Sequence, residues 1–517
     1  MERIETETEV HRFQKAIKHQ LNIARTGGDI LFSDSKVHIY IAPNVLHAAG
    51  GQLCIALMVN LLARMKTAVT EVAMHIPPGV PVQKPVPLQG NDLRHGLSQL
   101  VQSINGPESK YAVQFNFDGI MRNPTVTVSI GASDSTINAA NIRVEANAWT
   151  AYINASRPRA DWNPELPFGS HIAATLATAE IFKHLLLHNF PQQTAQLQIK
   201  LLDDTEFCAL TYGRDPGENQ HPVIDGTLHL DNVAIAGVGA GGSAALYTLS
   251  CLQSLAGEIT LIDPGCHKQS NLSRYMLSTY DDCHNRTLKS DRAYDFLKER
   301  HPLVDIQKEP LPYADVVDRN FRLVVSTVDT PEARWDIQQD WPSVILDAAV
   351  VESIYAVLRV YPGTGLCLGC KHPYDPEATW KRRASMWGKS LDEVRLLALE
   401  RALVSQSDIE QLAYVQNQPI ERFAELVGMP FDRVPAITEC GDTRFNLQVP
   451  NQAATIPFVT TMAGVLIASE IVKDHIARAT VLNNWFEHNM FWEPKLNRYR
   501  FRPRVSSCQI CRNEALR

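Results

Sequence analysis

The chain has 517 residues, of which 45% are hydrophobic and 20% are charged, and its formal net charge is −7. This length predicts two or three domains of an ordinary globular protein, and the mild acidity argues against a nucleic-acid partner. The first ten residues are charged and no run of about 18 uncharged apolar residues occurs, so we expect neither a signal peptide nor a membrane span. We therefore expect a cytoplasmic protein.

The first half of the chain predicts alternating strands and helices. From Val37 the sequence reads as a strand, VHIYIA, followed by an apolar helix over 49–65 and a second strand, EVAMHI, that stops before Pro77. Another strand, TVTVSI, begins at Thr125, and a long apolar helix begins at Pro167. This order of elements is typical of an α/β domain.

A glycine-rich turn opens the second half. Residues 233–263 predict a strand, a turn containing Gly237, Gly239 and Gly242, a helix, and a second strand that ends at Asp263. Glycines allow backbone N–H groups to approach phosphate, the helix N-terminus favours anions, and the acid can bind ribose hydroxyls. Taken alone, this unit fits a dinucleotide-dependent dehydrogenase as well as any other nucleotide-binding protein.

Four polar residues after this unit favour a triphosphate. Asn271 and Arg274 follow the second strand, Lys289 comes next, and Asp329 stands in STVDT at the end of another apolar strand. An amide, a guanidinium, an ammonium group and a second carboxylate suit phosphate oxygens and a hard cation such as Mg²⁺ better than a nicotinamide. The sequence therefore predicts an ATP site.

The two halves resemble each other. TVTVSIGASD lies about 197 residues before LVVSTVDT, and the helix PFGSHIAATLATAEIFKHLL lies about 290 residues before PFVTTMAGVLIASEIVKDHI. We interpret the chain as two homologous halves, 1–225 and 226–517; the alternative is chance similarity between two α/β segments. The first half has Pro43 and Pro77 where the second has its glycine loop and Asp263, which predicts a half that has lost its nucleotide ligands.

The change in offset places an insert of about 93 residues in the second half. Within it, a charged helical stretch carries Val394, Leu397, Leu399 and Leu403, which suit an amphipathic helix that packs on something. The insert also contains Cys440, in a polar stretch. The sequence therefore predicts a separate helical unit within the second half.

Four cysteines form two CxxC pairs that are far apart in the sequence, Cys367/Cys370 and Cys508/Cys511. In a reducing compartment this spacing predicts a tetrahedral zinc site. The alternatives are a redox-active pair or incidental spacing. A shared zinc ion would connect the end of the chain to its middle.

The motifs GVGAGG, LIDPG, SNLSR, RTLKSD and STVDT, together with the two CxxC pairs, resemble the ThiF/MoeB superfamily of adenylating enzymes, in particular the ubiquitin-activating enzymes. The resemblance implies an α/β fold of two Rossmann-like ThiF-type adenylation domains in a monomeric pseudo-dimer, with a helical catalytic-cysteine insert in the second. The modest length resembles bacterial versions, such as those of antiphage ubiquitin-like conjugation systems of the Bil type.

The resemblance also implies domain bounds. The inactive adenylation domain would cover 1–225. The active domain with its zinc site would cover 226–371 and 456–517, and the catalytic-cysteine insert would cover 372–455.

By the same resemblance, the ATP-binding residues have separate roles. Asp263 would hold the ribose, the three glycines would form the turn beside the phosphates, and Asp329 would hold Mg²⁺. The residues expected to contact phosphates are Asn271, Arg274 and Lys289. One departure is Gly265, which occupies the place where the family usually has a second acid.

Two further catalytic residues rest on the resemblance. Arg12, in EVHRFQ, is similar to an N-terminal arginine that reaches the partner's nucleotide, and the alternative is a solvated helix arginine. Cys440 lies where the family carries its catalytic cysteine, and the alternative is a structural cysteine in a chain that only adenylates.

Three functions are therefore open. In the first, the chain adenylates a ubiquitin-like protein, forms a thioester on Cys440 and transfers the protein to a conjugating enzyme. In the second, it only adenylates a sulfur-carrier protein or a peptide. The third, an assembly scaffold with a vestigial nucleotide site, conflicts with the retained Lys289 and Asp329.

Overall fold

The computed structural model describes most of the chain. The residues outside the description are 1–16, 19–31, 33–34, 108, 110, 132–139, 163–165, 196, 218–219, 223, 225, 319, 362–364, 374, 432–433, 435–454, 477–483, 495–500, 509 and 512–517, and the side chains of 422 and 425. Two predicted catalytic residues, Arg12 and Cys440, lie among them.

The first half forms a seven-stranded sheet with the strand order β3-β2-β1-β4-β5-β6-β7. The strands from β3 to β5 in that order are parallel, and β6 and β7 are antiparallel to their neighbours. The elements are β1 (Lys36–Ile41), α2 (Pro43–Leu46), α3 (Ala49–Ala63), β2 (Glu71–Met74), α4 (Leu93–Asn105), β3 (Gln114–Asn116), β4 (Val126–Ile130), β5 (Ile142–Ala146), β6 (Thr150–Ile153), α5 (Phe168–Asn189), α6 (Pro191–Thr194) and β7 (Thr205–Cys208).

The second half repeats this sheet, with the order β10-β9-β8-β11-β12-β13-β14. Its elements are β8 (Leu228–Ala236), α7 (Ala240–Leu249), β9 (Leu255–Ile262), η2 (Gln269–Asn271), α8 (Tyr280–His284), α9 (Lys289–Arg300), β10 (Val304–Glu309), η3 (Tyr313–Asp315), β11 (Leu323–Ser326), α10 (Pro331–Gln339), β12 (Val344–Val351), β13 (Ile354–Val360), α11 (Leu368–Lys371), α16 (Pro457–His475) and β14 (Trp485–Asn489). The predicted fold of two Rossmann-like domains is confirmed.

Strand register corrects one detail of the sequence comparison. Val37 pairs with Val72 in the first sheet, and Val233 pairs with Ile259 in the second. Four residues beyond each of these partners lie Ile76 and Asp263, and both donate a backbone N–H to the next strand. Ile76, rather than Pro77, therefore occupies the place of Asp263, because a slip of one residue would reverse which face each side chain takes.

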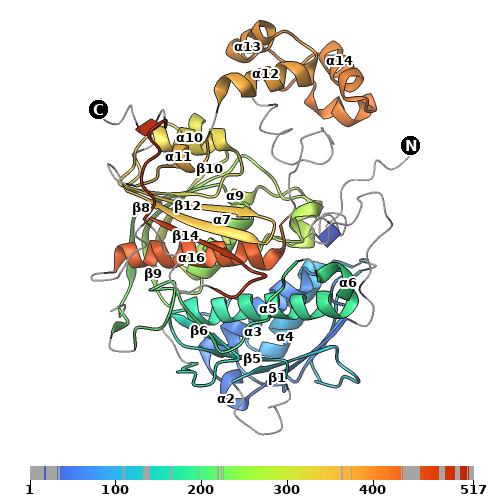
Figure 1. Ribbon diagram of the computed structural model, residues 1–517, viewed down its shortest axis with the longest axis vertical. Coiled ribbons are helices and arrows are strands. Elements are labelled where there is room, and N and C mark those ends of the chain that lie inside the picture. The colour runs from blue at the N-terminus through green and yellow to red at the C-terminus, as the bar shows by residue number, and fades with distance from the viewer. Residues whose placement is uncertain are drawn as a thin grey trace.

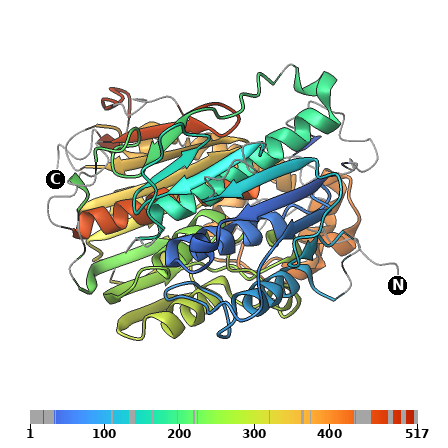
Figure 2. The same ribbon diagram turned by 90° about the horizontal axis from the view of Figure 1, so that it is seen from below.

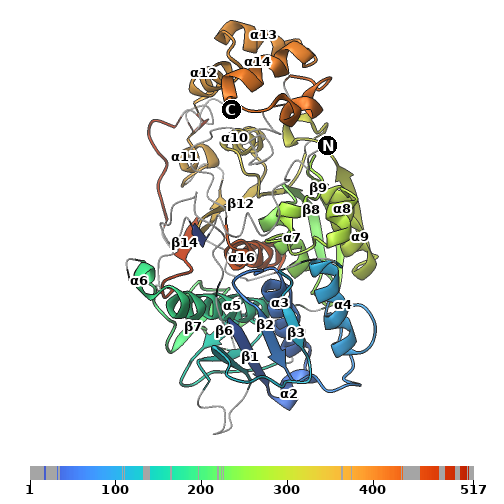
Figure 3. The ribbon, with the colours of Figure 1, turned by 90° about the vertical axis from the view of Figure 1, so that its right-hand side faces the viewer.

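Helices of both halves meet between the two sheets. Figure 1 and Figure 3 show α16 and α7 under the second sheet and α5 and α3 over the first. All four are apolar on every side, and nearly all residues of α3 and α16 are buried, because one face packs on a sheet and the other on the opposite half. Phe182 of α5 lies 5.6 Å from Phe458 of α16, measured between ring centroids. The halves thus share one continuous core.

The outer faces of the two sheets differ. In β1, Val37 and Ile39 are buried against the shared core, whereas Tyr40 is 41% exposed. Figure 2, a view from below, shows the blue-to-cyan strands of this first sheet across the front. The outer face of the second sheet instead packs against α10 and α11 and forms a second apolar cluster. This covered face is where the cysteine pairs lie.

A helical unit within the second half has its own core. It comprises α12 (Pro376–Trp387), α13 (Leu391–Leu399), α14 (Gln406–Gln416) and η4 (Ile420–Leu426). Trp387, Val394 and Phe423 are fully buried within it, and Figures 1 and 3 show it at the end of the molecule opposite the first half. Arg383 of α12 donates to Glu332 of α10 over 2.7 Å, which anchors the unit near the end of β11.

The predicted packing face of this unit was partly wrong. Val394 is fully buried, but Leu399 is 83% exposed and Leu403 is 64% exposed. Leu399 is five residues after Val394, which is about 140° around the helix and off its buried face. Leu403 does not continue that face because α13 ends at Leu399. Among the described helices, none combines the length and the hydropathy needed to cross a bilayer.

Candidate nucleotide and metal sites

The glycine loop between β8 and α7 is pressed against the end of β11. Gly237 has φ of +91°, and a Cβ there would lie 2.8 Å from the backbone of Thr327. A Cβ at Gly242 would lie 2.1 Å from the carbonyl oxygen of Gly237. Both positions therefore require glycine, for a left-handed backbone in one case and for a close approach in the other.

Thr327 fixes this loop from the neighbouring strand. Its N–H donates to the carbonyl of Ala236 over 2.9 Å, and its hydroxyl donates to the carbonyl of Gly237. The motif STVDT drew attention to its acid, but the threonine's contact with the glycine loop depends on the pairing of β8 with β11. Only the three-dimensional arrangement reveals that role.

Asp263 lies at the end of β9, beside the glycine loop. It is 5% exposed, and its carboxylate accepts the N–H groups of Val238 over 2.8 Å and Gly265 over 2.7 Å. Lys289, the first residue of α9, places its Nζ 3.3 Å from the same carboxylate. The structure therefore brings together the predicted acid, the predicted lysine and the glycine loop.

Gly265 makes this ion pair possible. A Cβ at this position would lie 2.7 Å from the Nζ of Lys289 and 3.0 Å from an oxygen of Asp263. The residue that departs from the family pattern thus leaves room for the lysine to approach the acid.

The segment after η2 carries the other predicted phosphate ligands. Asn271 is buried, and its Oδ1 accepts the N–H of Lys268 over 3.0 Å. The guanidinium of Arg274 donates to the carbonyl of Ser270 over 3.3 Å and lies 5.3 Å from the ring centroid of Tyr275. The asparagine thus shapes its own loop, while the arginine lies beside an aromatic ring.

Tyr275 connects this segment with the glycine loop. The Nζ of Lys289 lies 5.6 Å from its ring centroid, and a Cβ at Gly239 would lie 3.5 Å from its hydroxyl. Tyr275 is not among the residues for which the sequence analysis predicts a role. In the structure it lies among three of the residues predicted to bind the nucleotide.

Asp329, the predicted magnesium ligand, is exposed. It follows Thr327 and Val328, whose backbone atoms contact the glycine loop. An exposed carboxylate next to that loop suits a cation that keeps part of its water shell, as Mg²⁺ does.

The described donor set fits a nucleotide with its phosphates. The N-terminus of α7 begins at the loop, two cationic side chains lie nearby, and a buried carboxylate is held by backbone N–H groups. Helix N-termini and cations stabilise phosphate, and a fixed carboxylate can accept hydrogen bonds from ribose.

Asp347 forms a buried charge cluster that sequence reasoning missed. Its carboxylate accepts Ser326 Oγ over 2.8 Å and Arg334 Nε over 2.9 Å, with Lys371 at 3.3 Å and His372 at 3.1 Å. Burial acts to raise the pKa of Asp347, but the neighbouring Arg334, Lys371 and His372 hold it well below its usual value. The one sequence feature that could have indicated this cluster is a single acid within the apolar strand VILDAAVV.

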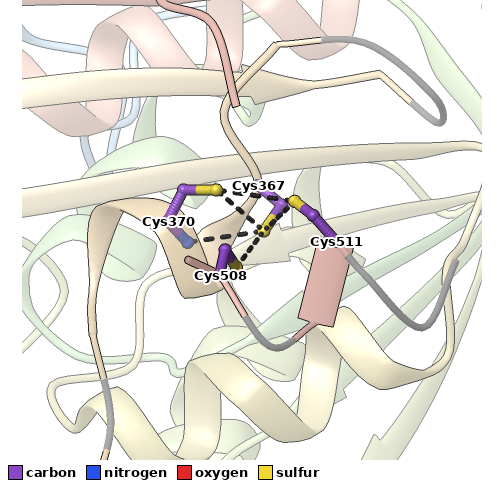
Figure 4. A group of neighbouring side chains, drawn as sticks. All are labelled: Cys367, Cys370, Cys508 and Cys511. Carbon is purple, nitrogen blue, oxygen red and sulfur yellow. Dashed lines mark hydrogen bonds between the residues drawn. The ribbon is translucent and has the colours of Figure 1, made fainter. Parts of the chain in front are cut away.

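The four CxxC cysteines come together, as Figure 4 shows. Their sulfur atoms all lie within 4.8 Å of one another, and the Sγ atoms of Cys367 and Cys511 are 3.3 Å apart. Zn–S bonds of about 2.3 Å in a tetrahedron place the sulfurs about 3.8 Å apart, so the cluster can bind zinc. The N–H groups of Cys370 and Val505 donate to cluster sulfurs, as second-shell donors do.

Comparison with known protein families gives two matches that together span both halves. The ThiF family model matches residues 225–510, which is more than half of the chain. The BilD N-terminal domain model matches residues 36–195. The second match agrees with the expected resemblance to a Bil-type system.

Individual relatives are more distant. An uncharacterized protein of Sinorhizobium fredii, y4jF, is 25% identical over 82% of this chain and 79% of its own length. The adenylyltransferase and sulfurtransferase UBA4 of Kluyveromyces lactis is 25% identical over 32% of this chain, which spans only 39% of that relative.

Among solved structures, MccB of E. coli crystallised with MccA is similar over 55% of this chain and 67% of its own, with 16% identity and a TM-score of 0.33. The family match and the duplicated sheet together show that the chain belongs to the ThiF family and is an adenylyltransferase-like member of the ThiF/MoeB superfamily.

Proposed function

We propose that this chain activates the C-terminal carboxylate of a ubiquitin-like protein by adenylation, takes that protein as a thioester on Cys440 and passes it to a conjugating enzyme. The observation that carries the adenylation step is the Asp263–Lys289 pair beside the glycine loop, within the half that matches the ThiF family. The match of the first half to the BilD N-terminal domain supports a modifier pathway of the Bil type.

In the adenylation step, a carboxylate oxygen of the substrate attacks the α-phosphorus of ATP. The bond from that phosphorus to the bridging oxygen of pyrophosphate breaks, and an acyl-adenylate and pyrophosphate result. Asp263 binds the ribose, the N-terminus of α7 and the glycines face the phosphates, and Asn271, Arg274 and Lys289 stabilise their charge. Asp329 would hold Mg²⁺, which would supply further charge neutralisation at the leaving pyrophosphate.

Lys289 has two roles in this scheme. In the structure its ammonium group lies beside Asp263 and Tyr275. The flexible side chain of lysine lets the ammonium group turn from the acid to a phosphate oxygen while the acid receives the ribose. This exchange keeps both charges partnered before and after the nucleotide binds.

The thioester step uses a cysteine outside the described residues. The thiol of Cys440 would lose its proton, its sulfur would attack the acyl carbon of the adenylate, and AMP would leave. Support comes from the position of Cys440 in the chain, between the helical unit of residues 376–426 and α16. Arg12, also outside the described residues, is proposed as an arginine that reaches the nucleotide from the first half.

A second candidate function stops at the adenylate. The relative UBA4 is named an adenylyltransferase and sulfurtransferase, which favours activation of a sulfur-carrier protein or a peptide without a thioester on the enzyme. The helical unit, with a core of its own, favours the first function because adenylation alone has no evident need for it.

The two candidates differ in a thiol-labile adduct. The protein is incubated with ATP, Mg²⁺ and a candidate ubiquitin-like partner, and ATP–pyrophosphate exchange is measured beside a non-reducing gel. We expect exchange in wild type and in Cys440→Ala, but an adduct in wild type alone. Cys266→Ser, which changes a cysteine outside the metal cluster, is the matched control and should retain the adduct. Exchange without an adduct in any variant would favour the second candidate, and no exchange with any partner would contradict both.

A further inference from the structure

Arg64 of the first half reaches into the second half. It follows α3 directly and is 1% exposed. One Nη donates to the carbonyl of Leu272 over 2.7 Å, and the other donates to the carbonyls of Met276 and Ser278, each over 3.0 Å. These three acceptors belong to the segment that follows Asn271 in the second half.

The orientation of Arg64 is fixed from its own helix. Its Nε donates to the Oδ1 of Asn60 over 2.7 Å, and the amide of Asn60 donates to Met276 over 3.3 Å. A guanidinium is permanently charged and planar, so an almost fully buried one needs acceptors at fixed angles. Main-chain carbonyls from a single segment meet that need only when the segment has one particular shape.

The contacted segment is the one that carries predicted nucleotide ligands. Arg274 and Tyr275 lie between the carbonyls that Arg64 holds, and Asn271 immediately precedes the first of them. From the other side, Arg292 of α9 donates to the carbonyl of Leu277 over 3.2 Å. The segment is thus held between a helix of the first half and the helix that begins with Lys289, an arrangement that Figure 3 shows with α3 and α4 below α7, α8 and α9.

Among the described residues, this contact runs from the first half to the second and is not repeated in reverse. Gly51 and Gly242 are equivalent, because a Cβ at either would lie within about 2.2 Å of a carbonyl of its own loop. Counting nine residues on from each pairs Asn60 with Cys251, a buried thiol that lies just beyond α7 and donates to the carbonyl of Tyr247 in that helix. In the described part of the second half, the counterpart of Asn60 therefore makes no equivalent hydrogen bond to the first half.

We propose that Arg64 is a positioning residue for nucleotide binding: the first half uses it to set the shape of residues 271–278 and so presents Arg274 to ATP. This inference rests on the proposed function for the identity of the ligand, ATP. The effect of Arg64 on the shape of residues 271–278 does not depend on the proposed function. The first half is thereby a working part of the ATP site of the second half.

The test uses Arg64→Lys in the full-length protein, with hydrogen exchange followed by mass spectrometry and kinetics of ATP–pyrophosphate exchange. Lysine keeps the charge but cannot span three carbonyls. We expect faster amide exchange in peptides covering 269–278, with peptides of α16 unchanged. We expect the KM for ATP to rise about tenfold, equal to about 1.4 kcal/mol, while kcat changes less than about threefold.

Two further variants separate positioning from general stability. Asn60→Ala keeps the arginine and removes its orienting partner, so it should give the same pattern at a smaller size. Tyr212→Phe is the matched control: it removes another hydrogen bond between the halves, from Tyr212 to Glu470, and should leave residues 269–278 and the KM for ATP unchanged.

The outcomes are distinct. Unchanged amide exchange over 269–278 in both Arg64→Lys and Asn60→Ala would overturn the inference, as would an equal effect of Tyr212→Phe. Faster exchange over 269–278 with unchanged binding of a fluorescent ATP analogue would overturn the link to the nucleotide. Because amide exchange is measured without substrate, a wild-type protein that lacks pyrophosphate exchange would contradict the proposed function without deciding the role of Arg64.

Discussion

The loops that connect β1 with α3 and β8 with α7 occupy corresponding places in the two halves, but different groups fill the space beside them. In the second half, β8 runs through Gly237 into α7, and the loop is open enough to face Asp263 and Lys289. In the first half, the short helix α2 occupies the corresponding loop, and Val45 from it packs against Gly131 at the end of β4. The space beside the first loop is thus filled by the chain itself.

The filling of the first site is fixed by hydrogen bonds. Gln52, one residue after the retained Gly51, donates to the carbonyls of Leu46 over 2.7 Å and Pro81 over 2.9 Å. Ile76, fully buried, stands where the second half has its acid. The comparison teaches that both loops need a glycine for the close packing of loop and helix, whereas an apolar side chain takes the place of Asp263 in the first half.

Removal of the metal should have the largest effect, and it concerns the second half alone. We expect one zinc per chain. Structural zinc contributes about 10–16 kcal/mol of apparent binding free energy in small peptides, so its removal should strongly lower the thermal midpoint. Metal analysis and thermal unfolding with and without a chelator test this. Cys266→Ser should retain the zinc, whereas a metal-free protein with an unchanged midpoint would contradict a structural role.

The buried acid Asp347 has a counterpart at the corresponding position of the first sheet. Ser326 pairs with Asp347 and Ser129 pairs with Arg143, so the buried acid of the second sheet corresponds to an exposed arginine of the first. Asp347→Asn should lower the free energy of unfolding by about 3–5 kcal/mol, because it leaves buried cations without a carboxylate. Arg143→Gln should change it by less than about 0.5 kcal/mol. Urea unfolding measures both, and equal effects would contradict the comparison.

The stabilisation that Asp347 gives to the folded protein should also depend on pH. The pKa of Asp347 is held well below its usual value, so the folded protein keeps this carboxylate ionised at a pH where the unfolded chain protonates it. Its stabilisation is therefore fully present above about pH 5 and is lost as the pH falls below about 4. Urea unfolding should be measured from pH 7 to 3. The difference in the free energy of unfolding between wild type and Asp347→Asn should narrow only at the acidic end of this range.

The glycines test the loops directly. Gly242→Ala and Gly51→Ala introduce the same close contact, at 2.1 and 2.2 Å from a carbonyl oxygen of their own loops. Both should destabilise the protein by about 1–3 kcal/mol, but only Gly242→Ala should weaken ATP binding, by about 100-fold. Titration with a fluorescent ATP analogue decides this. An equal loss of affinity in both variants would mean that the first loop also serves the nucleotide.

Gly265→Ala should have the smallest effect. Its Cβ would meet the flexible end of Lys289, so the lysine can move and the fold should lose less than about 0.5 kcal/mol. The added methyl group would keep the ammonium group of Lys289 from its place beside the glycine loop, from which it turns to a phosphate, so the KM for ATP should rise severalfold, less than with Gly242→Ala. A KM equal to that of wild type would show that the position of Lys289 set by Gly265 is unimportant for binding.

Part of the candidate site could be predicted because its residues are close in sequence or follow a fixed spacing. The glycines, Asp263 and the CxxC pairs belong to local motifs, and Lys289 follows the same unit. Thr327, Tyr275 and Asp347 needed the structure, since each acts on a residue from another element. The packing prediction for Leu403 failed because a periodic pattern does not mark where a helix ends. For Leu399 it failed because this residue lies about 140° around the helix from the buried Val394.

The sequence by itself determined the duplicated α/β fold, the ThiF resemblance and the location of the nucleotide loop, because strand and helix periodicity and glycine spacing are local properties of the chain. Tertiary structure alone decided that Ile76 stands opposite Asp263, that α2 fills the first site, and that Arg64 holds the loop of the second. Register and contacts between halves depend on which faces pack together, and no local pattern records that choice.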